Sequence, residues 1–129
     1  MMTPPHWVNE VLAEFGRSAG IGSFSFGDRS TAALSFESGA SLIFEYAYSS
    51  LVVMMTVPVS IDPSVAAKAL EFVTPERRGD FRVKAGLLSE KGRVFFAVRL
   101  PHEEVSLPVI NSAFSHLRRF ADQFGEGAR

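Results

Sequence analysis

The chain has 129 residues, which is enough for one domain with its own hydrophobic core, and we predict a single domain over residues 1–129. Its formal net charge of −1 at pH 7 gives no general attraction to nucleic acid or anionic lipid. The sequence contains no cysteine, which excludes disulfides, thiolate nucleophiles and cysteine-based metal sites.

A short amphipathic helix is predicted at the start of the chain. Thr3 is a candidate N-cap, and Pro4 and Pro5 suit the first helical positions, where a backbone N–H has no partner in any case. Gly16 and Gly20 provide stop signals. Bulky apolar residues recur between these limits at helical spacing: Trp7, Val8, Val11, Leu12 and Phe15.

Three alternating runs then predict a meander of antiparallel strands. The first two runs, residues 32–37 and 40–46, are joined by the turn Ser38-Gly39. A second tight turn near residues 48–50 leads into the third run.

The third run, residues 51–57, is apolar at both alternating sets of positions. It is too short to cross a membrane, and Pro58 ends it because proline cannot donate to a strand ladder. Such a strand is covered on both faces or leaves one face for a partner. We expect one face to lie under helices and the other, with Val53 or with Val52 and Met54, to be available to a peptide. For most residues of this strand, burial in an ordinary core is the interpretation that we favour.

The second half of the chain predicts a helix, a hairpin and a final helix. Asp62 is a good N-cap for a helix over Pro63–Val73, whose three alanines permit close approach of another helix. Alternating runs at residues 81–87 and 93–100 form the hairpin, and the last helix begins at residue 106 or 107 and ends at Phe124. The order helix, three strands, helix, two strands, helix predicts an α+β fold, with helices packed on a mainly antiparallel twisted sheet.

Catalytic and metal-binding patterns are weak in this sequence. His102-Glu103-Glu104 offers polar groups, but no second histidine lies at a ligand spacing, so we interpret the segment as a polar connection. The serines lack a Gly-x-Ser-x-Gly context, and Gly20-x-Gly22 does not follow a strand. We therefore expect no enzyme, no metal and no cofactor.

The pattern of elements resembles the class I type III secretion chaperones over nearly the whole chain. It rests on the first amphipathic helix, the strands through residues 51–57 and the mid-chain helix Pro63–Val73. Three short segments add to it: Leu34-Ser35-Phe36-Glu37-Ser38-Gly39, Arg99-Leu100-Pro101 and Leu117-Arg118-Arg119-Phe120-Ala121. The resemblance implies a small bacterial cytoplasmic protein, linked to virulence, without enzymatic activity. Such a protein binds the N-terminal segment of a secreted effector and keeps it competent for export.

The resemblance also implies two kinds of surface and no insertion into a membrane. The first is a homodimer interface made by the mid-chain helix and the strand after it, here Ala66, Ala69, Leu70, Val73, Phe81, Val83 and Ala85. The second is an effector-binding surface that combines apolar patches with strand addition at a sheet edge. By position its residues are Trp7, Val11, Phe15, Leu34, Phe36, Ile43, Phe44 and Val53.

The alternative function is a small-ligand- or peptide-binding regulatory domain of the same fold. A closed apolar cavity enclosed by Phe44, Val53 and Phe95 would favour this alternative, whereas flat exposed patches would favour the chaperone. An enzyme would need a cleft in which His102, Glu103 or Glu104 converges with other polar groups.

Overall fold

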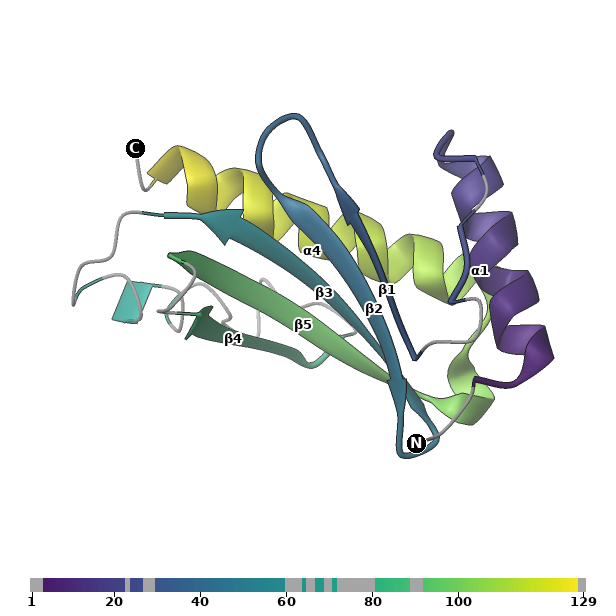
Figure 1. Cartoon of the computed structure of the whole chain (residues 1–129). Coiled ribbons are helices and arrows are strands. Elements are labelled where there is room, and N and C mark those ends of the chain that lie inside the picture. Colours follow the sequence, from purple (N-terminus) through teal and green to yellow (C-terminus); the bar gives the residue numbers. More distant parts are fainter. Residues whose placement is uncertain are drawn as a thin grey trace.

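The architecture is one antiparallel sheet with helices packed against one of its faces (Figure 1). The computed structural model describes residues 4–22, 24–26, 30–59, 64, 67–68, 71, 81–88 and 92–127. The helices are α1 (His6–Ser18) and α4 (Leu107–Gly127), and a 3₁₀ turn, η2 (His102–Glu104), precedes α4. The strands are β1 (Thr31–Ser35), β2 (Ser41–Ala47), β3 (Ser50–Pro58), β4 (Val83–Leu88) and β5 (Arg93–Pro101).

The strand order is β1-β2-β3-β5-β4, and every neighbouring pair is antiparallel. The predicted α+β class, the meander of three strands and the second hairpin are therefore confirmed. Of the predicted helix Pro63–Val73, the structure describes residues 64, 67–68 and 71, all in helical conformation, and the other positions lie outside the described residues.

Strand β3 occupies the centre of the sheet, between β2 and β5. Its helix-facing residues are buried, while Val52 and Met54 on the opposite face are only half-buried. The expectation that one face of this strand lies under helices is confirmed. The core residues with no exposed surface include Leu42, Phe44, Leu51, Val53, Val94 and Phe96 from the sheet, and Leu12, Phe15, Ile110 and Leu117 from the two helices.

The ends of α1 differ from the sequence prediction. Pro5 is the N-cap, with an extended ψ of 150°, so neither proline occupies a helical position, and the predicted cap Thr3 lies outside the described residues. Gly20 ends the helix with a φ of +76°, and the backbone N–H of Ile21 donates to the Gly16 carbonyl at 2.8 Å. This is a Schellman motif, which places a glycine just past the helix end.

Gly16 is a contact residue, because the helix continues for two residues beyond it. A Cβ added at Gly16 would lie 2.6 Å from the Gly22 carbonyl oxygen and 2.8 Å from the Phe24 Cβ. The returning segment therefore packs directly against the backbone of α1, and a side chain at Gly16 would push it away.

Gly16→Ala should destabilise the fold by about 1–3 kcal/mol, because the clash involves backbone atoms. A glycine-to-alanine change inside a helix ordinarily stabilises by up to about 1 kcal/mol, so the sign of the effect is diagnostic. Urea unfolding followed by circular dichroism measures it. An unchanged or more stable variant would show that residues 22–24 move away without cost.

Arg93 joins β5 to β3 and to the β1–β2 turn on the face of the sheet that the helices leave open. Its guanidinium donates to Thr56 Oγ1 at 2.8 Å and also to the Gly39 carbonyl at the β1–β2 turn. Thr56 is 1% exposed although it points away from α1 and α4, since the Arg93 side chain lies over it. The contact fixes the β1–β2 turn to the centre of the sheet.

Arg93→Met should lower the free energy of unfolding by about 1–3 kcal/mol, because the acceptors at Thr56 and Gly39 lose their charged donor. Arg99→Met is the matched control: Arg99 is an exposed arginine on the same face of the same strand. We expect its unfolding midpoint to stay at the wild-type value or to rise slightly, because Arg99 has no hydrogen-bond acceptor to lose among the described residues and lies opposite another cation, Arg82. Equal losses in the two variants would refute a specific role for Arg93.

Candidate partner-binding surfaces

The eight residues predicted to bind an effector separate into three groups. Phe15, Phe44 and Val53 are 0% exposed and belong to the core, so we correct their assignment from surface to core. The helical period turns Phe15 inward with Leu12. Phe44 and Val53 face each other across β2 and β3 on the helix-facing side. A partner cannot reach any of the three while the core is packed.

The remaining five residues keep accessible surface but do not form one patch. Trp7 is 37% exposed, and Val11, Leu34 and Phe36 are half-buried on the side of the sheet where the helices lie. Ile43 is half-buried on the opposite side, because it alternates with Leu42 and Phe44 along β2. The structure thus divides the predicted binding set between the two faces of the sheet.

Phe114 joins the accessible residues of β1 to the core, and the sequence prediction missed it. Its ring stacks on Phe36 with centroids 6.4 Å apart and meets the buried Phe15 ring edge-on at 5.4 Å. Leu34 lies two residues before Phe36 on the same face of the chain. We call Leu34, Phe36 and Phe114 the apolar rim. Helical spacing places Phe114 among the apolar positions of α4 but does not show that its ring is only half-buried.

The backbone of β1 has one free side beside this rim. The Phe36 N–H donates to the Ala40 carbonyl at 2.9 Å, and the Tyr46 N–H donates to the Ser30 carbonyl at 2.8 Å. Because hydrogen-bonded pairs alternate in an antiparallel ladder, the N–H and C=O groups of Thr31, Ala33 and Ser35 point away from β2. In the part of the chain that the structure describes, no strand pairs with that side.

The free edge of β1 lacks the features that normally prevent edge pairing. Its sequence, Thr-Ala-Ala-Leu-Ser, contains no charged residue and no proline. The opposite edge strand, β4, carries Lys84 and follows Arg82. An unprotected edge beside half-buried apolar side chains is the geometry on which an extended peptide adds as a further strand.

A polar and aromatic contact closes the end of the sheet where α1 begins. The Tyr46 hydroxyl and His102 Nδ1 lie 2.9 Å apart, and the Trp7 ring meets the His102 ring edge-on with centroids 4.8 Å apart. The His102 backbone N–H donates to the Ser49 carbonyl at 3.0 Å. Tyr48 and Ser49 make a two-residue hairpin turn with φ of 52° and 56°, and Tyr48 is 86% exposed. His102 therefore connects α1, η2 and the β2–β3 turn.

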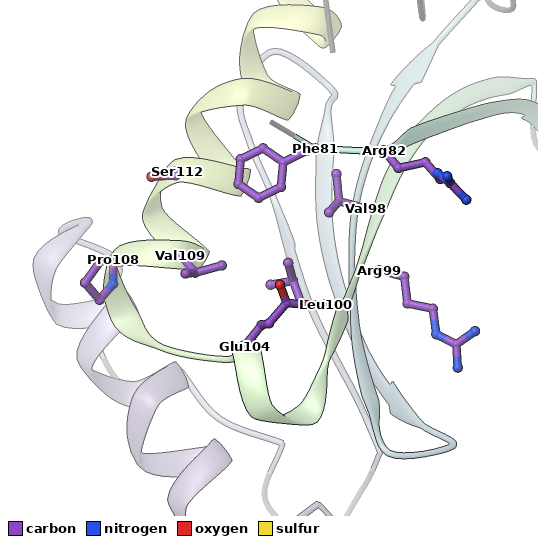
Figure 2. A pocket seen from close by; sticks show the side chains of 9 residues that line it. All are labelled: Phe81, Arg82, Val98, Arg99, Leu100, Glu104, Pro108, Val109 and Ser112. Carbon is purple, nitrogen blue, oxygen red and sulfur yellow. The ribbon is translucent and has the colours of Figure 1, made fainter. Parts of the chain in front are cut away.

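A pocket of about 440 Å³ opens between β5, η2 and the first turns of α4 (Figure 2). Phe81, Val98 and Val109 point into it, and Glu104 stands at its rim. Arg82 and Arg99 point to the other side of the strands. Glu104 is the only member of the segment 102–104 among the lining residues, and within the described chain no three histidine or acidic residues are grouped to hold a metal ion.

The alternative function, a small-ligand-binding domain, would be favoured by a closed cavity between Phe44, Val53 and Phe95, but these side chains do not lie on one side of the sheet. Phe44 and Val53 are buried on the helix-facing side, whereas Phe95 pairs with Thr56 and Gly86 on the opposite side. The sheet itself separates the Phe95 ring from the side chains of Phe44 and Val53. Phe44, Val53 and Phe95 therefore do not enclose a common cavity, and the observation that would have favoured the alternative function is not made.

Four of the predicted dimer residues, Ala66, Ala69, Leu70 and Val73, lie outside the described residues. The other three occupy alternate positions in β4 and the segment just before it, on the helix-facing side. Val83 is 3% exposed, while Phe81 and Ala85 are half-buried. The Phe81 ring also packs near His116, with centroids 5.8 Å apart.

Among the described helices, none is both long and apolar enough to cross a membrane. A search of curated proteins finds no match to the sequence.

Solved structures show the same fold at low sequence identity. A chain of the ExsC–ExsE complex has a TM-score of 0.81 and 18% identity over 98% of this chain and 97% of that chain. A chain of the HopA1–SchA chaperone–effector complex has a TM-score of 0.69 and 20% identity, over 95% and 99% of the two chains. A chain of the heterodimeric ExoU–SpcU complex from the type III secretion system of Pseudomonas aeruginosa has a TM-score of 0.63 and 15% identity, over 90% and 93%.

The sequence itself identifies the family. The model described as the type III secretory system chaperone SycN matches residues 7–124, from the second residue of α1 into the last turns of α4. Because this match spans almost all of the chain, the protein belongs to the SycN family of type III secretion chaperones.

Proposed function

We propose that this chaperone acts without catalysis, by holding an extended segment of a type III secreted protein on the free edge of β1. The unprotected edge beside the apolar rim carries the proposal. Backbone groups of Thr31, Ala33 and Ser35 supply hydrogen bonds that do not depend on the partner's sequence. Leu34, Phe36 and Phe114 supply apolar contacts for alternate side chains of the segment.

Two of the similar structures, the chaperone–effector complex HopA1–SchA and the type III ExoU–SpcU complex, support a secreted protein as the partner. An extended segment from the N-terminal part of that protein suits a short edge strand, because strand addition needs an unfolded partner. The protein would act in the bacterial cytoplasm, before its partner is exported.

Ala33→Pro removes one free-edge N–H of β1 and leaves the ladder with β2 intact. Loss of one backbone hydrogen bond on binding should weaken the complex about tenfold or more. The tagged wild-type chain is used to purify the secreted partner from the native host. Calorimetry then compares the partner's N-terminal segment on the wild type and the variant.

Ala33→Thr is the control, since it keeps the N–H and suits a strand. Both variants should show the wild-type circular dichroism spectrum and melting temperature. If Ala33→Pro is folded and binds as tightly as Ala33→Thr, the segment does not add to β1. If the wild type binds no secreted protein, the proposed function itself fails.

We also propose that two copies associate through β4 and the segment before it, together with the mid-chain helix. Phe81 and Ala85 keep half-buried apolar surface on an edge strand, which suits contact with a second copy. The three alanines of the predicted helix Pro63–Val73 fit the same association, because small side chains permit a close approach.

Light scattering at micromolar concentration should give twice the mass of the 14.1 kDa chain. Ala85→Arg should give the mass of one chain, because it places a charge in the proposed interface, whereas Lys84→Ala on the other face should stay dimeric. A wild type of single-chain mass contradicts the dimer. A dimeric, folded Ala85→Arg variant contradicts this interface.

A further inference from the structure

The face of the sheet opposite α1 and α4, which we call the outer face, combines an apolar strip with a group of cations. The register aligns Ala33, Ile43, Met54, Ala97 and Lys84 in one row across the five strands. Neither α1 nor α4 covers this face, since both pack against the opposite one.

The cations of the outer face lie at the β4–β5 end. Arg82, Lys84 and Arg99 are all exposed. Val83 pairs with Val98, so continuing the register places Arg82 opposite Arg99. Figure 2 shows both arginine side chains on the same side of the strands, away from the pocket. Like charges in opposite positions on neighbouring strands destabilise a sheet, so this arrangement has a cost for the isolated chain.

These three cations have no carboxylate partner in the described part of the chain. The ion pairs found there join His6 to Glu10 and Arg118 to Asp122, both on helices. Glu45, in the same row as Arg99, lies two strands away with Val52 between them. Arg93, at the other end of the face, differs because its donors are already used on Thr56 and Gly39.

An apolar strip lies directly beside the cations. Val52 and Met54 of β3 and Phe95 and Ala97 of β5 are half-buried on the outer face. Met54 and Ala97 are paired across the two strands, and Val52 is paired with Arg99. The strip thus continues into the basic group without a break, and the flexible Met54 side chain can adapt its shape to a partner.

The strands of the outer face limit which conformation a bound segment can have. Strands β3 and β5 are each paired on both sides, so they offer side chains but no free N–H or C=O groups. A docked segment must therefore satisfy its own backbone, as an α-helix does. The cations require acidic groups, and the apolar strip beside them favours a protein over a nucleic acid for a chain of net charge −1.

We propose that the outer face docks an acidic amphipathic helix of a partner protein. Its apolar stripe lies on Val52, Met54 and Ala97, and its carboxylates pair with Arg82, Lys84 and Arg99. This surface is separate from the edge of β1 and does not depend on the function proposed there.

The test uses a fluorescein-labelled synthetic helix of about 18 residues, with leucine at i, i+3, i+4 and i+7 and glutamate on the flanks. Anisotropy should show binding that weakens with added salt, and the same peptide with lysine in place of glutamate should bind more weakly. Arg82→Gln/Arg99→Gln should weaken binding of the glutamate peptide about fivefold. Arg118→Gln/Arg119→Gln, the same charge change on α4, should leave it unchanged.

Charge reversal gives a result that loss of folding cannot imitate. Arg82→Glu/Arg99→Glu should bind the lysine peptide better than the glutamate peptide, while Ala33→Pro should bind the glutamate peptide as the wild type does. The proposal is overturned if the two peptides bind the wild type equally, if the α4 control weakens binding as much, or if the preference does not reverse. A change of oligomeric state in Arg82→Gln/Arg99→Gln would also overturn it, by assigning the face to a second copy of the chain.

Discussion

The fold depends on the burial of one face of β3 and β5 under α4. Leu51, Val53 and Val98 from the strands have almost no exposed surface, and the Phe96 ring stacks on Phe120 of α4 with centroids 5.5 Å apart. Since side chains alternate along a strand, burial of one set of β3 and β5 side chains under α4 also determines which side chains lie on the opposite face of the sheet. A shift of one residue in the register would expose the core of both strands, so the outer face is specified as strictly as the inner one.

The same one-sided packing explains where the accessible groups lie. Strand β1 is the last strand on its side of the sheet, and half of its backbone groups have no strand partner among the described residues. Phe114 connects this edge to the core through the rings of Phe36 and Phe15. Contacts made at the edge are therefore supported by well-packed residues, which reduces the entropy lost when a partner binds.

The order of elements, the meander and the second hairpin followed from the sequence, because alternation and helical spacing are strong in these segments, whereas the pairing of β3 with β5 did not. Residues 51–57 were predicted to form a strand with one face under helices, and the structure agrees. The alternation did not show which side each strand presents to the helices, so Phe44 and Val53 were assigned to a binding surface although they are core. Gly16 was interpreted as a helix stop, because a contact with the backbone of residue 22 leaves no mark in local sequence.

Pairs that are distant in sequence were the least predictable. The contact of Tyr46 with His102 joins residues 56 positions apart, and Arg93 reaches the turn at Gly39 across β3. Phe95 was grouped with Phe44 and Val53 because all three are apolar, but the register decides on which side of the sheet each side chain lies. The group formed by Arg82, Lys84 and Arg99 likewise depends on cross-strand pairing and not on any run of charge.

Because helices cover only one face of the sheet, the proposed binding sites at the β1 edge and on the outer face are separate, which affects how many partner polypeptides can bind at once. The free edge of β1 and the cations beside β5 are separated by β2 and β3, a distance of about 15 Å at the usual strand spacing. One continuous polypeptide would need a connection of several residues around the sheet to occupy both. With the two proposed sites, two different proteins would instead be able to bind at the same time, and each would affect the other through the stability of the shared sheet.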